Sequence, residues 1–271
     1  MKIISLVENI SHSELEAGYG LALYIETEKH TLLFDLGPDE TIIRNAKKRG
    51  IDLSLVDTVI ISHGHWDHGG ALEAFLKIND HAKIYIQKEA FAPHFRKYMG
   101  DEAYIGLETS LMENKQFVLL TGDHEIDEEL FLFTVTNIEK NRSEANDTLF
   151  MEDGLDRFSH EQSLIIKGEK NTLIMGCGHT GVTNIMEKAA VFAPKVCIGG
   201  FHLYNPTTKK TVSDALLENI AAELSQYDTD FYTCHCTGEE AFRYLSEKLR
   251  HMEYFSCGEA IGYENGCFKK I

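Results

Sequence analysis

The sequence lacks the features that most directly mark membrane proteins and nucleic-acid-binding proteins. No apolar run reaches the roughly 18 residues that a membrane-spanning helix needs, so we expect no membrane partner. Lysine and arginine number 26 against 43 aspartate and glutamate residues, which gives a formal charge of −17. This charge argues against nucleic acid as the main partner, although a local basic pocket could still receive an anion.

Cysteine is also scarce, and its distribution argues against a small secreted domain held together by disulfides. Six cysteines occur among the 271 residues, all in the second half of the chain. We therefore expect reduced thiols and a cytoplasmic location. Residues 1–8 carry no long apolar segment with a cleavage site, so we expect a strand there rather than a signal peptide.

The chain shows no sign of a division into separate modules. Apolar residues make up 43% of it, enough for a substantial core, and no linker rich in proline, glycine or serine interrupts it. Strand patterns feed helical patterns in both halves, so we expect an α/β fold over residues 1–271, with the halves forming two layers of one domain. Residues 90–115 are expected to form a helical insertion, with a lid or an oligomer contact as the alternative. The polar segment 141–158 is expected to be a long loop.

The periodicity of apolar residues and the turn signals predict the individual elements. Expected strands cover residues 2–8, 20–25, 31–34, 59–61, 83–87, 117–120, 130–135, 163–167, 172–175, 196–198 and 230–233. Expected helices cover about 40–49, 71–77 and 212–224, with two more ending near 191 and 249. Thr237 and Glu240 fit a capping box at the start of the last helix.

The densest chemical signal is the stretch from Ser62 to Gly70. Within it, six consecutive positions hold three histidines and one aspartate, namely His63, His65, Asp67 and His68. An apolar run at 59–61 precedes them, so the cluster lies where a rigid strand ends and a loop begins. Imidazole and carboxylate are ligands for Zn, Fe and Mn. A purely structural role explains these four side chains poorly, because buried adjacent imidazoles need partners.

Three later histidines repeat this placement. His179, His202 and His235 each follow an apolar strand and stand among glycines or small residues, so these strand ends could meet at one edge of a folded sheet. For any one of them alone, a structural histidine near a turn is an equally good explanation. His160 precedes a strand and could approach the site. We assign six other histidines to the surface, namely His12, His30, His81, His94, His124 and His251.

These motifs resemble those of one large family. His63-x-His65-x-Asp67-His68 matches the hallmark motif of the metallo-β-lactamase superfamily, and Phe34-Asp35-Leu36-Gly37 resembles its first motif, whose aspartate lies behind the metals. The segments around His179, His202 and His235 are similar to the subgroup that includes the dihydropterin-ribofuranosylaminobenzene phosphate synthase and related metallohydrolases. The resemblance extends from about residue 31 to residue 238 and implies a four-layer αββα sandwich with a metal centre at one edge.

Carried over by position, the resemblance implies a centre of two divalent ions, with Zn favoured and Mn or Fe as alternatives. It assigns His63, His65 and His179 to one ion, and Asp67, His68 and His235 to the other. Many members have a further aspartate or cysteine that bridges the metals, and no clear equivalent is visible here. Gly176-Cys177-Gly178-His179-Thr180-Gly181 could occupy that position, in which case His160 would replace His179 as a ligand.

The ligand set implies a metal-dependent hydrolase. Divalent ions lower the pKa of a bound water from ~15.7 towards ~7, and the resulting metal-bound hydroxide would attack a small-molecule ester or phosphoester. Asp67 would orient that hydroxide. His202 would contact the substrate or donate a proton, with a structural role nearly as well supported. The helix starts near Gly178 and Gly238 could receive a phosphate group.

Three other functional classes remain as alternatives. The subgroup resemblance favours a transferase that condenses a dihydropterin methyl diphosphate with an aromatic acceptor. A di-iron enzyme that reduces oxygen or NO is less well supported, because such enzymes generally carry a flavin domain after the metal domain. A binding module without catalysis would have lost metal ligands, whereas the motif here is intact. The sequence identifies neither the substrate nor the oligomeric state.

Overall fold

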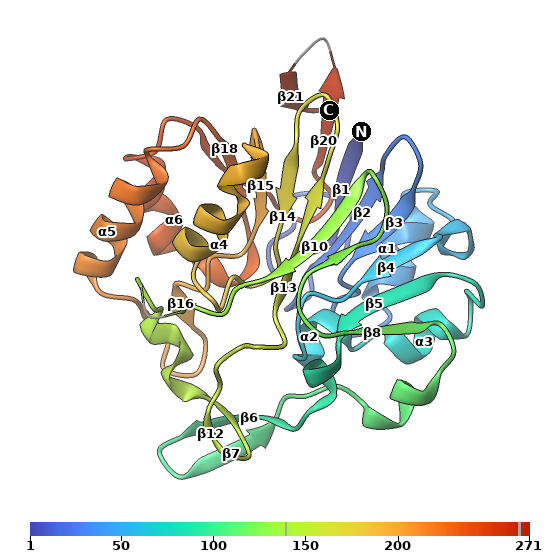
Figure 1. The fold of residues 1–271 in the computed structure, drawn as a ribbon, viewed down its shortest axis with the longest axis horizontal. Helices are drawn as coiled ribbons and strands as arrows, with labels where there is room; N and C mark the ends of the chain where they lie inside the picture. Colours follow the sequence, from blue (N-terminus) through green and yellow to red (C-terminus); the bar gives the residue numbers. More distant parts are fainter. Residues whose placement is uncertain (139, 265–266) are drawn as a thin grey trace. The chain divides into compact units, whose positions relative to one another are not determined.

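The structure is a computed structural model that describes residues 1–138, 140–264 and 267–271, and it is mixed α/β (Figure 1). Packing divides the chain into two compact units, which are described separately. Unit 1 comprises Met1–Ala92, Gly106–Thr121 and Phe255–Ile271, and unit 2 comprises Pro93–Ile105 and Gly122–Tyr254. The expectation of one domain over residues 1–271 stays a prediction.

Unit 1 is built on an eight-stranded sheet in the order β21-β20-β1-β2-β3-β4-β5-β8. The strands are β1 (Lys2–Val7), β2 (Ala22–Glu26), β3 (Thr31–Phe34), β4 (Thr58–Ile60), β5 (Lys83–Gln87), β8 (Phe117–Leu120), β20 (Ala260–Glu264) and β21 (Cys267–Lys270). The helices are α1 (Thr41–Lys48), α2 (Trp66–Gly69) and α3 (Leu72–Leu76), with 3-10 turns η1 (Leu53–Leu55), η2 (Lys88–Phe91) and η3 (Thr109–Glu113). Because β3, β4, β5 and β8 run parallel, their carboxyl ends share one edge of the sheet.

The core of unit 1 consists of apolar residues that the sheet register aligns. Leu33, Val59 and Ile84 lie side by side on β3, β4 and β5 and are fully buried. They belong to one core cluster with Ile42 of α1 and Phe75 of α3. Burying a side chain of this size stabilises the fold by roughly 1.5–3 kcal/mol relative to exposure. The strand ends that precede the histidine cluster are therefore held by a well-packed core.

Unit 2 is built on a seven-stranded sheet in the order β19-β18-β15-β14-β13-β10-β9. The strands are β9 (His124–Glu125), β10 (Leu130–Thr134), β13 (Gln162–Ile166), β14 (Thr172–Ile174), β15 (Val196–Gly199), β18 (Asp230–Thr233) and β19 (Met252–Tyr254). Strands β14, β15, β18 and β19 are parallel. Helices α4 (Val182–Ala189), α5 (Asp214–Leu224) and α6 (Glu239–Ser246) lie on one side of the sheet in Figure 1 and share a core with it. Shorter elements are η4 (Glu144–Thr148), η5 (Ala190–Phe192), η6 (His235–Thr237), β16 (Tyr204–Asn205) and β17 (Lys210–Thr211).

A small four-stranded sheet in unit 2 corrects two of the sequence-based expectations. It consists of β6 (His94–Tyr98), β7 (Asp101–Tyr104), β11 (Leu149–Met151) and β12 (Gly154–Leu155). The helical insertion at 90–115 is therefore wrong at its centre, where β6 and β7 form an antiparallel hairpin. The expected long loop at 141–158 instead contains η4, β11 and β12. The cause is the pairing of β6 with β11, which joins segments far apart in the sequence and leaves no local signal.

The other predicted strands and helices are present, with ends shifted by a few residues. The capping box is wrong, because the N-cap of α6 is Gly238 and makes no side-chain cap. The Thr237 hydroxyl instead accepts a hydrogen bond from the Phe201 amide at 2.9 Å. The five cysteines whose side chains are described are buried and form no disulfide with one another, while the side chain of Cys267 lies outside the described part.

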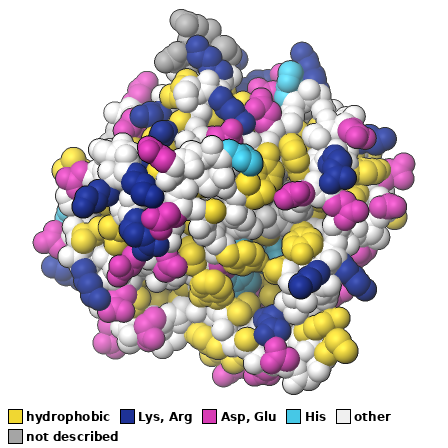
Figure 2. Space-filling model, turned by 180° about the vertical axis from the view of Figure 1, so that it is seen from behind, with side chains coloured by type: hydrophobic (Ala, Val, Ile, Leu, Met, Phe, Trp, Pro, Cys, Tyr) yellow, Lys and Arg dark blue, Asp and Glu magenta, His cyan; other side chains and the backbone are white. Residues whose placement is uncertain are grey.

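The face of the molecule drawn in Figure 2 carries charged side chains of both signs. On the face drawn in Figure 2, lysine and arginine side chains are interspersed with aspartate and glutamate. Among the described residues, no helix combines the length and the apolarity needed to cross a bilayer.

Candidate metal centre

The histidine cluster of unit 1 begins where two neighbouring parallel strands end. Phe34 of β3 is paired with Ile60 of β4, and the Asp35 amide donates to the Ile60 carbonyl at 2.8 Å. Asp35 and the residues that follow β4 are therefore side by side. Asp35 is fully buried and has a φ of 60°, a left-handed conformation that is uncommon outside glycine. Such strain at a strand end is typical of functional sites.

The Asp35 carboxylate organises the residues around it. One oxygen, Oδ1, accepts from the Ser62 amide at 2.7 Å. The other, Oδ2, accepts from the Ser62 hydroxyl at 2.7 Å and lies 2.6 Å from Nδ1 of His68. Because an ionised carboxylate can only accept, the His68 proton is on Nδ1 and the lone pair is on Nε2. Nε2 is thus the nitrogen that could bind a metal.

The same network fixes the tautomer of His63. The Ser62 hydroxyl has one proton, which it donates to Asp35, so it accepts from Nδ1 of His63 at 2.8 Å. Nε2 of His63 is left with its lone pair and lies 3.1 Å from Nδ1 of His65. The ring centroid of His63 is 4.6 Å from that of His65 and 4.2 Å from that of His68. This arrangement of buried imidazoles suits the binding of metal ions.

Asp67 also belongs to this group. Its Oδ2 is 3.8 Å from Nε2 of His68, the nitrogen that carries the free lone pair. The motif is tied to the loop after β3, because the His68 carbonyl accepts from the Leu36 amide at 2.8 Å. Gly70 allows the chain to turn closely here, since a Cβ at this position would lie 2.0 Å from the Pro38 carbonyl oxygen. Of the predicted ligands, the structure therefore gathers His63, His65, Asp67 and His68 in unit 1.

In unit 2, the backbone around His179 is held by a buried glutamate. Glu161 accepts from the His179 amide at 2.8 Å through Oε1, and from the Thr180 amide and hydroxyl at 2.8 and 2.7 Å through Oε2. Burial raises the pKa of the Glu161 carboxyl, while the hydrogen bonds from Thr180 and His179 oppose that rise. The carboxyl acts as a positioning group for the His179 turn.

The His179 ring is oriented by two further side chains. Its Nδ1 lies 3.0 Å from Oδ1 of Asn146, whose amide nitrogen donates to the His179 carbonyl at 2.9 Å. This pair of contacts identifies Oδ1 as the acceptor, so Nδ1 carries the proton and Nε2 is the candidate ligand nitrogen. The Phe158 ring stacks on the imidazole with centroids 4.4 Å apart and planes 3° apart.

His202 and His235 lie in the same part of unit 2. Both are buried and left-handed, with φ values of 46° and 52°, and they follow β15 and β18. The His202 ring centroid is 4.0 Å from that of His179, and the Ser143 hydroxyl donates to the His202 carbonyl. The Cys177 sulfur lies within 4.8 Å of ligand nitrogens of both His179 and His202. The structure thus brings His179 and His202 together beside Cys177.

A second group around Cys177 contains His235 and Cys236, again with ligand atoms within 4.8 Å of one another. The 3-10 turn η6 begins at His235, so the alternation of side chains along β18 does not continue through His235 and Cys236. Burial raises the pKa of the Cys236 thiol, yet hydrogen bonds with Cys177 and His202 and the nearby imidazoles outweigh it and hold the pKa well below its ordinary value.

The sequence reasoning missed several residues of this region. His94, assigned to the surface, is fully buried and lies with Asp156 and His160 rather than in solvent. Asn146 and Glu161 were also missed as positioning residues. Glu161 could have been noticed as a charged residue at the start of an apolar strand, whereas Asn146 carries no sequence signal. The assignment of each ligand to an ion, including His179 over His160, stays a prediction.

The chain is similar to proteins of one known superfamily. Residues 15–155 match a family model described as the Metallo-beta-lactamase superfamily. An uncharacterized protein of Methanocaldococcus jannaschii, MJ0448, is 30% identical over 269 residues, or 95% of this chain and 98% of the relative. The 7,8-dihydropterin-6-methyl-4-(beta-D-ribofuranosyl)-aminobenzene-5'-phosphate synthase of the same organism is 28% identical over 289 residues, or 97% of each chain.

A solved structure is also similar over its whole length. Tm1679, a metal-dependent hydrolase of the beta-lactamase superfamily, is 27% identical with a TM-score of 0.82, covering 98% of this chain and 100% of that one. These similarities confirm the expected α/β, metallo-β-lactamase-like fold class.

Proposed function

This chain belongs to the metallo-β-lactamase superfamily, and from that membership we propose that it is a metal-dependent hydrolase of a small-molecule ester or phosphoester. The observation that carries the proposal is the orientation of three imidazoles. His63, His68 and His179 each direct Nδ1 to an oxygen acceptor, so each presents Nε2 as a ligand. Outer hydrogen bonds of this kind orient histidines in metal sites.

The donor set fits two divalent ions. We assign His63, His65 and His179 to one ion, and Asp67, His68 and His235 to the other. Nitrogen and oxygen donors suit Zn, with Mn and Fe as alternatives. When bound, such ions lower the pKa of a water and polarise a carbonyl or phosphoryl oxygen.

The remaining chemistry falls to residues of the chain. Asp67 has a carboxylate beside His68 and would orient the attacking water. His202 is buried next to His179 and would contact the substrate or protonate the leaving group. We expect a small-molecule partner, possibly phosphate-containing, rather than nucleic acid or a membrane, and a cytoplasmic location.

The test combines metal analysis with activity. Purified protein would be analysed for metals and assayed on chromogenic phosphoesters, thioesters and lactams, with and without chelator. We expect bound divalent metal, and hydrolysis of at least one ester class that chelator abolishes and added Zn, Mn or Fe restores. A protein that binds none of these metals, and whose behaviour they do not change, would refute the proposal.

A transferase is the second candidate, because the similarity to the dihydropterin-aminobenzene phosphate synthase extends over 97% of both chains. The reaction would condense a dihydropterin methyl diphosphate with an aromatic acceptor, using the same metal ligands to stabilise the diphosphate leaving group. The discriminating assay follows product formation in the presence of both substrates. Condensed product favours the transferase, and release of diphosphate without condensation favours the hydrolase.

A further inference from the structure

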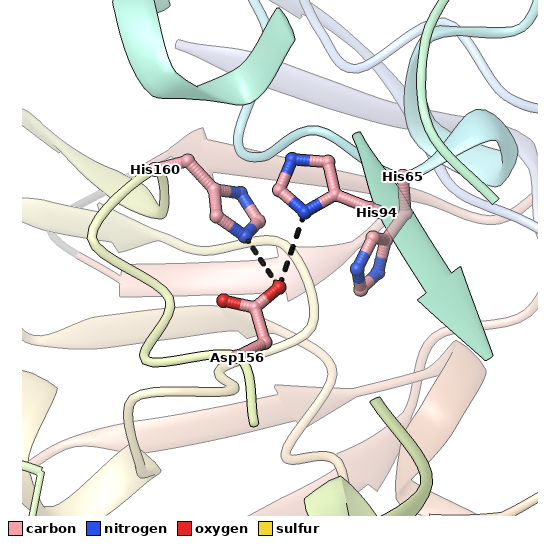
Figure 3. A group of neighbouring side chains, drawn as sticks. All are labelled: His65, His94, Asp156 and His160. Carbon is pink, nitrogen blue, oxygen red and sulfur yellow. Dashed lines mark hydrogen bonds and ion pairs between the residues drawn. The ribbon is translucent and has the colours of Figure 1, made fainter. Parts of the chain in front are cut away.

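A buried group of titratable side chains lies outside the motifs discussed above. His94, Asp156 and His160 are all in unit 2, and their side chains are fully buried. Figure 3 shows the imidazoles of His94 and His160 directed at the Asp156 carboxylate; His65, drawn in the same view, belongs to unit 1. Burying a carboxylate and two imidazoles is costly unless they are paired or bind an ion. The group therefore needs an explanation that the motif residues do not supply.

The geometry converges on a single carboxylate oxygen. Oδ2 of Asp156 is 3.2 Å from Nδ1 of His94 and 3.1 Å from Nε2 of His160. The two ring centroids are 4.1 Å apart. Oδ1 accepts from the Phe158 amide at 2.7 Å, which fixes the plane of the carboxylate and leaves Oδ2 for the imidazoles.

The small sheet holds these residues in place. His94 is the first residue of β6 and pairs with Met151 of β11, which also pairs with Gly154 of β12. Asp156 directly follows β12, and its amide donates to the Leu149 carbonyl at 3.1 Å. Two of the three side chains therefore project from the end of a hydrogen-bonded sheet, so the group is preorganised rather than carried on a loose loop.

Phe158 shapes the segment between Asp156 and His160. It has a φ of 55° and is almost fully buried, so a bulky residue is held in the left-handed region at a cost of roughly 1–2 kcal/mol. Its ring centroid lies 5.9 Å from that of His160 and 4.4 Å from that of His179. The aromatic ring thus stacks on the predicted ligand His179 and lies close to His160 of the buried group.

We propose that His94, Asp156 and His160 form a binding site for a divalent transition-metal ion, in addition to the two ions of the proposed centre. Two imidazoles and one carboxylate are a known ligand set for zinc and for non-haem iron. Ligands at about 2.0–2.2 Å from a tetrahedral ion are separated by about 3.3–3.6 Å. The observed separations of 3.1 and 3.2 Å are close to that spacing, so a small outward shift admits the ion.

The competing explanation is a hydrogen-bonded triad in which each imidazole nitrogen facing Asp156 carries a proton and no metal is bound. Both ring nitrogens would then donate to the same Asp156 oxygen. A buried carboxylate between two neutral imidazoles would retain its negative charge, whereas a divalent ion would compensate it. The two explanations differ in whether the imidazole nitrogens nearest Asp156 carry protons or a metal, and this difference is measurable.

The experiment uses the full-length chain freed of metal and loaded with ¹¹³Cd²⁺ as the probe. Each occupied site gives its own ¹¹³Cd resonance, and metal analysis counts the ions. We expect Asp156→Asn to lose one resonance and one equivalent of cadmium relative to the wild type. His63→Gln should remove a different resonance. The control His81→Gln, at a side chain that is 56% exposed, should lose none.

Further measurements keep the test decisive if Asp156→Asn does not fold. His94→Gln, checked by circular dichroism, should lose the same resonance. In the wild type, imidazole ¹⁵N spectra should show His94 and His160 changing to metal-bound shifts when cadmium or zinc is added. The proposal is overturned if those shifts stay unchanged, or if the triad variants keep every resonance of the wild type. It also fails if His63→Gln and Asp156→Asn remove the same one. If the wild type lacks the resonance that depends on His63 but shows the one that depends on Asp156, the proposed hydrolase centre fails and the triad site stands.

Discussion

Three residues of the candidate centre have backbone conformations that side-chain-bearing residues rarely adopt. Asp35, His202 and His235 have φ values of 60°, 46° and 52°. Each lies within three residues of the carboxyl end of a parallel strand, namely β3, β15 or β18. Each such conformation costs on the order of 1–3 kcal/mol and persists only where the surroundings hold it. For Asp35 the surroundings are clear, because its carboxylate accepts from Ser62 and contacts His68.

The substitution Asp35→Asn should weaken metal binding. Asparagine tolerates the left-handed backbone, but its amide group cannot accept all the hydrogen bonds that the carboxylate accepts. We expect zinc affinity to fall by about 10–100-fold, as for the loss of other outer-sphere partners. Competition with a chromophoric chelator measures this change. Asp80→Asn, at a side chain that is 99% exposed, is the control. Equal zinc affinities of the two variants would contradict a role of Asp35 in metal binding.

Glu161→Gln should destabilise the turn that carries His179. The carboxylate accepts three hydrogen bonds from His179 and Thr180. A glutamine can accept at only one of the two oxygen positions, so its NH₂ group would face at least one of the donors, and leaving a buried donor unsatisfied costs about 1–3 kcal/mol. Urea unfolding at neutral pH measures the loss. The matched control is Glu169→Gln, in the exposed turn between β13 and β14. A loss no greater than in the control would contradict the positioning role.

Strands and helices were predicted correctly where local sequence patterns determine them. Strands β3 and β4 contain short apolar runs, and polar motifs directly after them mark where the strands end. This part of unit 1 was therefore predictable. The position of the candidate ligands at 63–68, directly after β4, was predictable for the same reason. The pairing of Phe95 with Phe150 was not, because its hydrogen bonds join β6 and β11 across a large sequence separation. His94 and Asp156 depend on that pairing, so their burial could not be predicted.

The turn after α2 offers a test at the scale of the element. At Gly70 an added Cβ would lie 2.0 Å from the Pro38 carbonyl oxygen, which belongs to the backbone and cannot rotate away. We expect Gly70→Ala to lower the free energy of unfolding by about 1–3 kcal/mol, in the range of other overpacked sites. Gly168→Ala is the control, since its nearest neighbour is 4.0 Å away. Similar unfolding curves for both variants would show that the close approach does not matter.

The whole molecule consists of two units, each with its own apolar core. The chain has a formal net charge of −17, so bound divalent cations would offset part of the repulsion between its carboxylates. Ligands that bind only the folded state stabilise it by mass action, by about 2.7 kcal/mol at a hundredfold excess over Kd. We therefore expect the melting temperature to rise on adding zinc and to fall on adding chelator. No shift in either direction would argue against metal binding by the folded chain.

The most direct measurement of the central claim is the number of zinc ions per chain in the wild type and in the double variant His63→Gln/His68→Gln. A difference between the two proteins is unaffected by any ion held elsewhere. Circular dichroism would establish that the variant is folded, and His81→Gln would serve as the control. The proposed centre predicts that the double variant binds two fewer ions than the wild type, while the control binds the same number. Equal zinc content in the wild type and the double variant would contradict it.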